Sequence, residues 1–78
     1  MSIDYDIFVD AKGLKCPQPL LLAKQGLEQL VNGKVLLIKA TDPHTDLDLE
    51  VWCARFGHKI IYQNENNGEF EFWIQKHA

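Results

Sequence analysis

Several features on which common classes of protein depend are scarce in this chain. Its 78 residues include only two cysteines, too few for a disulfide framework, and free thiols suit a reducing compartment. No apolar run approaches the roughly 20 residues that span a bilayer, and the acidic start, Met1–Asp6, lacks a signal-peptide pattern. The net charge of −3 disfavours non-specific binding to nucleic-acid phosphates. We therefore expect a soluble cytoplasmic protein with no membrane contact and no direct nucleic-acid contact.

Repeats, linkers and low-complexity segments are also missing, so residues 1–78 are expected to form one domain with a small core. The hydrophobic fraction of 46% is typical of a globular chain and argues against disorder. No set of cysteines and histidines has the paired spacing of a zinc site, and Cys53 with His58 makes only a two-ligand pattern. We expect neither a metal ion nor a cofactor.

Hydrophobic periodicity predicts four strands. Apolar and polar residues alternate over residues 3–9, which is the pattern of a strand with one buried face. The continuous apolar run Val35–Ile38 predicts a central strand. A third strand begins at Lys59, and Asn67-Gly68 is a strong hairpin signal that leads into the last strand. That strand alternates an apolar set with a largely polar set: Phe70, Phe72 and Ile74 against Glu69, Glu71, Trp73 and Gln75.

Two segments between these strands have the spacing of helices. The first follows Pro17, stops at Asn32-Gly33, and repeats apolar residues every three or four positions: Leu20, Ala23, Leu27 and Leu30. The second is expected to begin at an N-cap, Thr45, and to end at Gly57. Its apolar stripe is Leu49, Trp52, Cys53 and Phe56. With right-handed crossovers, the order β-α-β-α-β-β predicts an α/β two-layer sandwich that has both helices on one face of a mixed sheet.

The segment Gly13-Leu14-Lys15-Cys16-Pro17-Gln18-Pro19 places a thiol where a loop turns into the first helix. Pro17 suits the first helical position, which makes Cys16 the expected N-cap. A sulfur there faces the positive end of the helix dipole and the unpaired N–H groups of the first turn, and Lys15 is adjacent. All of these favour the thiolate, so we expect the pKa of Cys16 to lie below that of a free cysteine.

Pro19 stands where a disulfide-exchange motif would have its second cysteine, so Cys16 has no local dithiol partner. A lone activated thiol can be a catalytic nucleophile, an oxidation sensor, or a carrier of sulfur in the form of a persulfide. Nucleophilic catalysis needs a base near the nucleophile, and no sequence pattern marks any of the three histidines, at positions 44, 58 and 77, as that base. The carrier hypothesis asks least of the rest of the chain.

The second cysteine and the acidic residues near it have structural interpretations. Cys53 lies on the apolar stripe of the second helix, so we expect it to be buried, with a raised pKa. Leu47 and Val51 lie off the stripe, and either contact a partner or widen the buried face. Four carboxylates at the start of this helix either dock a basic partner or cap the helix and aid solubility: Asp42, Asp46, Asp48 and Glu50.

The chain resembles the TusA/SirA-like family of small sulfur-carrier proteins over nearly its whole length. The central match is Cys16-Pro17-Gln18-Pro19, the family's Cys-Pro-x-Pro motif, which Gly13-Leu14-Lys15 precedes and an apolar helix follows. Further matches are Asp42-Pro43, Asp48, Trp52-Cys53 and Gly57-His58. The resemblance implies a four-stranded mixed sheet with two helices on one side. It also implies that Cys16 is the reactive residue, with supporting positions at Lys15, Pro17, Gln18, Pro19, Asp42 and Asp48.

The resemblance further implies a sulfur relay. Cys16 would receive sulfur from a cysteine desulfurase or a rhodanese-like donor and pass it to an acceptor protein, for 2-thiolation of tRNA wobble uridine, sulfur oxidation or cofactor assembly. Leu47 and Glu50 stand where the family often has a basic residue and a proline, which bears on the identity of the partner. We hypothesise a sulfurtransferase-like carrier rather than a turnover enzyme. The alternatives are a thiol redox enzyme that uses Cys16 and a regulatory or binding module that does not use the thiol.

Overall fold

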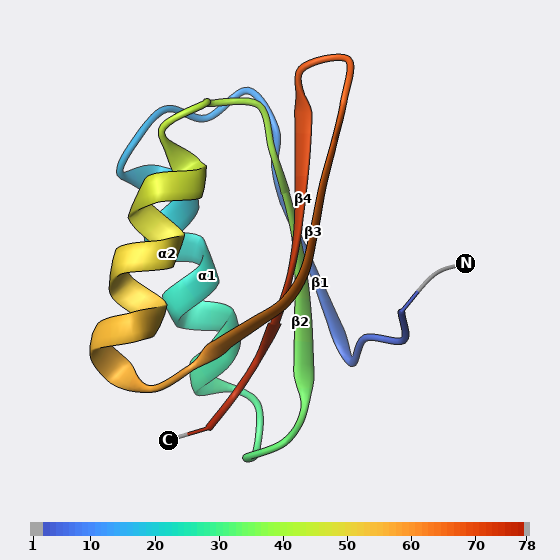
Figure 1. The fold of residues 1–78 in the computed structure, drawn as a ribbon, viewed down its shortest axis with the longest axis vertical. Helices are drawn as coiled ribbons and strands as arrows, with labels where there is room; N and C mark the ends of the chain where they lie inside the picture. Colours follow the sequence, from blue (N-terminus) through green and yellow to red (C-terminus); the bar gives the residue numbers. More distant parts are fainter. Residues whose placement is uncertain (1–2, 78) are drawn as a thin grey trace.

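The computed structural model describes residues 3–77 and has two layers, a four-stranded sheet with a pair of helices on one of its faces (Figure 1). Met1, Ser2 and Ala78, which belong to the expected domain 1–78, lie outside the described residues. The element order is the predicted β-α-β-α-β-β: β1 (Ile7–Ala11), α1 (Gln18–Glu28), β2 (Val35–Ala40), α2 (Thr45–Phe56), β3 (Lys59–Asn66) and β4 (Glu69–Gln75). Within residues 3–77, neither helix has the length and apolar character that a membrane crossing requires.

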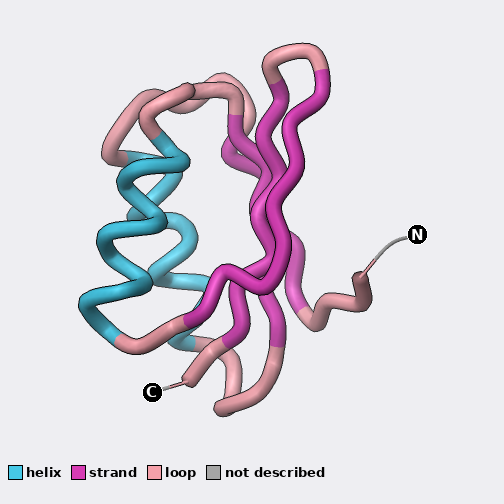
Figure 2. The backbone as a smooth tube through the Cα atoms, viewed as in Figure 1, coloured by secondary structure: helices cyan, strands magenta, loops and turns pink. Residues whose placement is uncertain are grey.

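The sheet is mixed, as predicted, with the strand order β1-β2-β4-β3. Figure 2 shows the strands gathered in one layer beside the two helices. The β1 and β2 strands are parallel, whereas β4 runs antiparallel to both of its neighbours, β2 and β3. The apolar β2 strand is therefore central, in agreement with its continuous run of buried residues. A tight turn at Asn67-Gly68 joins β3 to β4, and both residues have positive φ, 53° and 82°, which confirms the predicted hairpin.

The main core lies between the sheet and the helices, and its buried members come from β1, β2, β4 and both helices: Ala11, Ala23, Leu27, Leu36, Ile38, Ala40, Leu49, Cys53, Phe72 and Ile74. The α1 helix packs closely on the sheet at Gly26. A Cβ atom at Gly26 would collide with the Leu36 side chain and press on that of Val9, so glycine lets the helix approach. This close packing fixes α1, and with it the loop before α1, relative to β1 and β2.

A second, smaller cluster on the opposite face of the sheet contradicts the predicted placement of Trp73. Its side chain was expected on a polar face, yet Trp73 is only 6% exposed and packs with Val35 and Leu37. Leu37 is directly opposite Trp73 in the β2–β4 register, and the Trp73 indole N–H donates to the Ile3 carbonyl at 3.0 Å. The central strands are thus apolar on both faces, and the N-terminal segment helps to cover the helix-free one.

The first strand is shorter than the alternation over residues 3–9 predicted, because β1 begins at Ile7. In the sheet formed by residues 3–77, β1 is an edge strand next to β2, which begins at Val35. Just before the ladder starts, Asp6 bonds Val35 twice: its backbone N–H donates to the Val35 carbonyl at 2.8 Å, and its carboxylate accepts the Val35 N–H at 2.9 Å. Among the described residues, 3–5 have no strand beside them, so Tyr5 is half-exposed and Ile3 joins the second cluster.

The helices differ from prediction at their ends. The buried positions of α2 are Thr45, Leu49 and Cys53, spaced by four residues, whereas Phe56 at the last turn is 50% exposed. Phe56 is the last residue of the helix, and its ring contacts that of Trp52, with the two centroids 5.5 Å apart, instead of being buried in the core. The α1 helix ends at Glu28, ahead of the expected stop at residues 32–33.

Candidate functional site

The candidate site lies at the edge of the sheet where β1 and β2 both end. Because these strands are parallel and end in register at Ala11 and Ala40, the β1–α1 and β2–α2 loops emerge side by side. The Gly13 N–H donates to the Thr41 hydroxyl at 2.9 Å and ties the two loops together. The starts of α1 and α2 therefore lie close together at this edge of the sheet.

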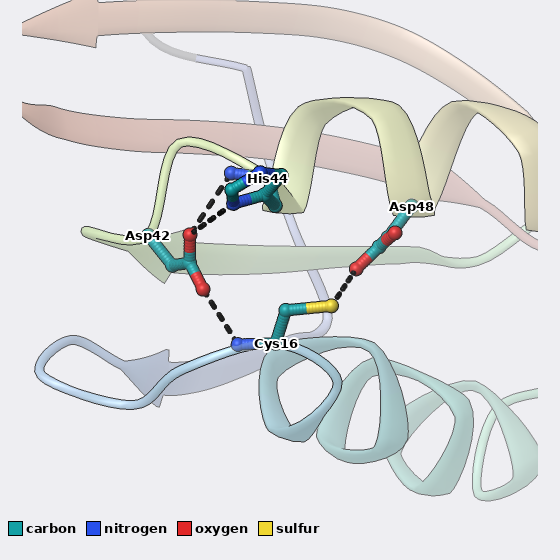
Figure 3. Close-up of polar contacts among 4 residues, drawn as sticks. All are labelled: Cys16, Asp42, His44 and Asp48. Atoms are coloured by element: carbon teal, nitrogen blue, oxygen red, sulfur yellow. Dashed lines mark hydrogen bonds and ion pairs between the residues drawn. The ribbon is translucent and has the colours of Figure 1, made fainter.

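Two carboxylates, one from the β2–α2 loop and one from the first turn of α2, contact Cys16 (Figure 3). The backbone N–H of Cys16 donates to Asp42 Oδ2 at 2.6 Å, and the Cys16 thiol donates to Asp48 Oδ2, with Sγ and Oδ2 also 2.6 Å apart. Asp42 belongs to the β2–α2 loop and Asp48 to the first turn of α2. The thiol itself is exposed to solvent, so its contact with Asp48 does not close the site.

Cys16 is not the N-cap of α1, which corrects the sequence prediction. The cap is Pro17, and the first helical residues are Gln18 and the buried Pro19. The Leu21 N–H donates to the Pro17 carbonyl at 3.1 Å, which makes Pro17 the first residue whose carbonyl the helix uses. A turn closed by the Gln18 N–H on the Lys15 carbonyl, at 2.8 Å, precedes the helix and carries Cys16 outside it.

The expected acidity of Cys16 is also wrong for this arrangement. Its pKa is raised above the ordinary value of 9.0, first by the hydrogen bond that the thiol donates to Asp48, then by partial desolvation and the negative charges of Asp48 and Asp42. A thiolate at this position would lose its donor role and face two carboxylates. These contacts outweigh the helix dipole and Lys15, which the sequence pattern emphasised.

Asp42 is the anchor of the site, and sequence reasoning missed its partner His44. Asp42 Oδ1 accepts the His44 backbone N–H at 3.0 Å and lies 3.3 Å from the His44 ring nitrogen Nδ1. The pKa of Asp42 is lowered because the N–H groups of His44 and Cys16 stabilise the carboxylate. The Asp-x-His spacing, typical of a side chain that bonds a backbone two residues on, was the available signal.

His44, rather than Thr45, also caps α2. The Asp48 N–H donates to the His44 carbonyl at 3.1 Å, so the helix begins one residue earlier in its bonding than predicted. Thr45 is 1% exposed, and its hydroxyl has no hydrogen-bond partner within residues 3–77. Thr45 is therefore a buried residue of the first turn of α2 and not its cap.

The remaining expected site residues divide into an exposed rim and a buried support. Lys15, Pro17 and Gln18 are exposed beside the thiol, whereas Pro19 is fully buried against the core. Cys53, in contrast with Cys16, is 2% exposed, as predicted, and burial raises its pKa to about 11. Both thiols are free. Within residues 3–77, no group of three or more His, Cys, Asp or Glu side chains is arranged so that it could hold a metal ion.

Comparison with known proteins identifies the family of this chain. Residues 7–76 match the family described as Sulfurtransferase TusA. The chain is 40% identical over 73 residues to the sulfur carrier protein TusA of Pseudomonas putida, covering 94% of this chain and 91% of that one. It is 36% identical over 78 residues to that of Pseudomonas aeruginosa, covering 100% and 99%. A SirA-like protein from Desulfitobacterium hafniense has a similar structure, with a TM-score of 0.80, 27% identity, and coverage of 94% of this chain and 100% of that one. The chain therefore belongs to the TusA family of sulfurtransferases.

Proposed function

We propose that this protein is a sulfur-relay carrier that accepts a persulfide sulfur on Cys16 and transfers it to an acceptor protein. The observation that carries the proposal is the contrast in exposure between the two thiols: Cys16 is exposed at a sheet edge, whereas Cys53 is buried. A relay works by direct contact with a donor and then with an acceptor, so its sulfur must be accessible to both. The relatives named sulfur carrier protein TusA support the same function.

In this proposal each residue around Cys16 has a distinct role. Pro17 and Pro19 limit the conformations of the helix start, so the sulfur is presented from a stiff platform. Asp42 fixes the Cys16 backbone through its N–H, and Asp48 contacts the sulfur. Lys15 and Gln18 are exposed beside the thiol, where a partner that reaches the sulfur would meet them.

The donor in this relay is a cysteine desulfurase or a rhodanese-like protein, and the acceptor is a protein of tRNA 2-thiouridine modification or of another sulfur-trafficking route in the cytoplasm. The start of α2 offers these partners an apolar and acidic surface next to Cys16. Leu47 and Val51 are 61% and 59% exposed, and Glu50 lies on the surface between them in sequence. Charge complementarity favours partners that bring basic residues to this surface.

The direct test is to incubate the protein with a cysteine desulfurase and cysteine, and to measure its intact mass without reductant. One added sulfur, about 32 Da, should appear on the native chain and on Cys53→Ala, and disappear with dithiothreitol, as a reversible thiol cap does. The same mass should be absent from Cys16→Ser, which is the matched control because it keeps a hydroxyl that can donate to Asp48.

The alternative functions predict different outcomes. A thiol redox enzyme would consume peroxide catalytically with a thiol reductant, and would gain no sulfur from desulfurase or rhodanese donors. A module that does not use the thiol would keep its biological activity in Cys16→Ser. Either result would contradict the carrier function.

A further inference from the structure

The contact between Cys16 and Asp48 joins the reacting sulfur to a carboxylate from another element. The two residues are 32 positions apart in sequence, and the contact exists because the parallel β1 and β2 strands deliver the starts of α1 and α2 to one edge. Figure 3 shows the thiol directed at Asp48, away from the Asp42 carboxylate that holds its backbone. Asp48 is half-buried, so its carboxylate has fewer water molecules with which to compete for the thiol.

The charges around the sulfur are predominantly negative. Asp48 faces it from α2, Asp42 holds its backbone from the β2–α2 loop, and His44 is paired with Asp42. Lys15 is the neighbouring cation in the β1–α1 loop, and the first turn of α1 carries no acidic residue. In this setting a thiol, which has a proton to donate, is held, and a sulfur anion is repelled.

Loading with sulfur converts the thiol, which Asp48 holds, into a sulfur anion, which the carboxylates repel. In the proposed transfer, the Cys16 thiol loses its proton to solvent and its sulfur attacks the outer sulfur of a donor persulfide. A new S–S bond forms on Cys16, the S–S bond of the donor breaks, and the donor sulfur leaves as a thiolate that takes up a proton from solvent. No net oxidation occurs, because a thiol and a persulfide exchange roles. The product persulfide is a stronger acid than a thiol, so it ionises near neutral pH and has no proton to donate.

We propose that Asp48 is a latch that distinguishes the unloaded carrier from the loaded one: it holds the Cys16 thiol by a hydrogen bond, and it expels the persulfide anion towards solvent. This inference rests on the proposed carrier function for its biological meaning. The terminal sulfur of the loaded form then points away from both carboxylates, towards an acceptor. An acceptor protein can thereby recognise the loaded carrier by the position of its sulfur.

The first test of the latch needs no sulfur donor. The rate of Cys16 alkylation by iodoacetamide is measured against pH for the native chain, Asp48→Asn and Glu50→Gln, with peptide-resolved mass spectrometry to separate Cys16 from Cys53. Asp48→Asn should shift the profile to lower pH and raise the rate at pH 7 several-fold, because the thiolate no longer faces a carboxylate. Glu50→Gln removes the same charge from an exposed position of the same helix and should leave the profile nearly unchanged.

The second test follows the Asp48 carboxylate during loading. The protein is labelled with ¹³C on its carboxyl groups and loaded with inorganic polysulfide, which transfers one sulfur and leaves one sulfur shorter. The Asp48 carboxyl signal should move on loading and return after dithiothreitol, while the Glu50 signal should stay. Thermal melts establish that each variant is folded.

The latch is overturned if Asp48→Asn and Glu50→Gln have the same alkylation profile as the native chain, or if the Asp48 signal does not respond to loading. Both readouts are independent of a protein donor. Failure of every desulfurase and rhodanese to load Cys16 would instead contradict the proposed carrier function, and the alkylation result would still decide whether Asp48 holds the thiol.

Discussion

The two thiols of this chain both have raised pKa values, but the main cause differs between them. Cys53 is buried in the core of α2, and loss of water alone raises its pKa to about 11. Cys16 is exposed, and its pKa is raised mainly by one hydrogen bond to Asp48. The first environment is permanent because it belongs to the packed core, whereas the second depends on a single side chain that a partner or a chemical change at sulfur can displace. Accessibility and a reversible contact, and not acidity, therefore distinguish the proposed carrier thiol from the structural one.

The largest effect on stability is expected when a negative charge is placed at each cysteine position in turn. Cys53→Asp buries an unpaired carboxylate, which should cost more than about 4 kcal/mol and unfold a domain whose stability is on the order of 3–5 kcal/mol. Cys16→Asp puts its charge at the surface and should remain folded, with a small loss from repulsion by Asp48. Thermal and urea unfolding followed by circular dichroism measure both. A folded Cys53→Asp with a native melting temperature would place Cys53 at the surface and undo the comparison.

A smaller effect is expected from alkaline pH. The folded pKa of Cys53 lies above its ordinary value of 9.0, so burial of the neutral thiol favours folding below pH 9, and this contribution is lost as pH rises towards about 11. Both proteins carry Cys16→Ser, so that only position 53 differs. Between pH 8 and pH 10.5, the free energy of unfolding of the protein with Cys53 should fall by about 2 kcal/mol relative to that of the protein with Cys53→Ala. Urea unfolding at several pH values gives the difference, and parallel curves for the two proteins would contradict it.

The smallest effect on stability is expected from loss of Asp42, which holds the Cys16 backbone. Asp42→Ala removes the acceptor of the Cys16 and His44 backbone N–H groups, which should lower the melting temperature by a few degrees at neutral pH. Because the pKa of Asp42 is lowered in the folded state, its contribution is present above its unfolded pKa and is lost as pH falls through the folded one. The melting temperatures of Asp42→Ala and the native chain should therefore converge in acid. Glu50→Ala is the control, and an equal loss there would show a general charge effect on α2.

Much of the fold could be predicted because it depends on local patterns. The apolar set of β4, Phe70, Phe72 and Ile74, packs in the main core, and Asn67-Gly68 forms the hairpin turn, because each depends on residues that are close together in the chain. Trp73 could not be placed in the same way. Its burial depends on Leu37 beside it in the sheet and on Ile3 from the N-terminal segment, and neither neighbour is visible from the alternation within β4.

Prediction of the site was limited in the same manner. The Cys16-Pro17 junction predicted a thiol at the start of the first helix, and Cys16 is exposed there. A helix N-terminus, however, involves only the element that follows Cys16. The structure places Cys16 one residue before the cap and surrounds it with side chains from the second connection. The sign of the pKa shift reversed because a carboxylate in direct contact acts more strongly than a dipole at the end of a helix.

The sequence by itself determined the order of the elements, the central place of β2, and the burial of Cys53 on an amphipathic helix, because each is encoded in residues that are near one another in the chain. Only the tertiary structure decided that Asp48 meets the Cys16 thiol. That contact spans 32 positions and exists because two parallel strands end at the same edge of the sheet and bring the two helix starts together. The chemistry of Cys16 is therefore set by strand pairing and loop placement, which no local pattern around Cys16 contains.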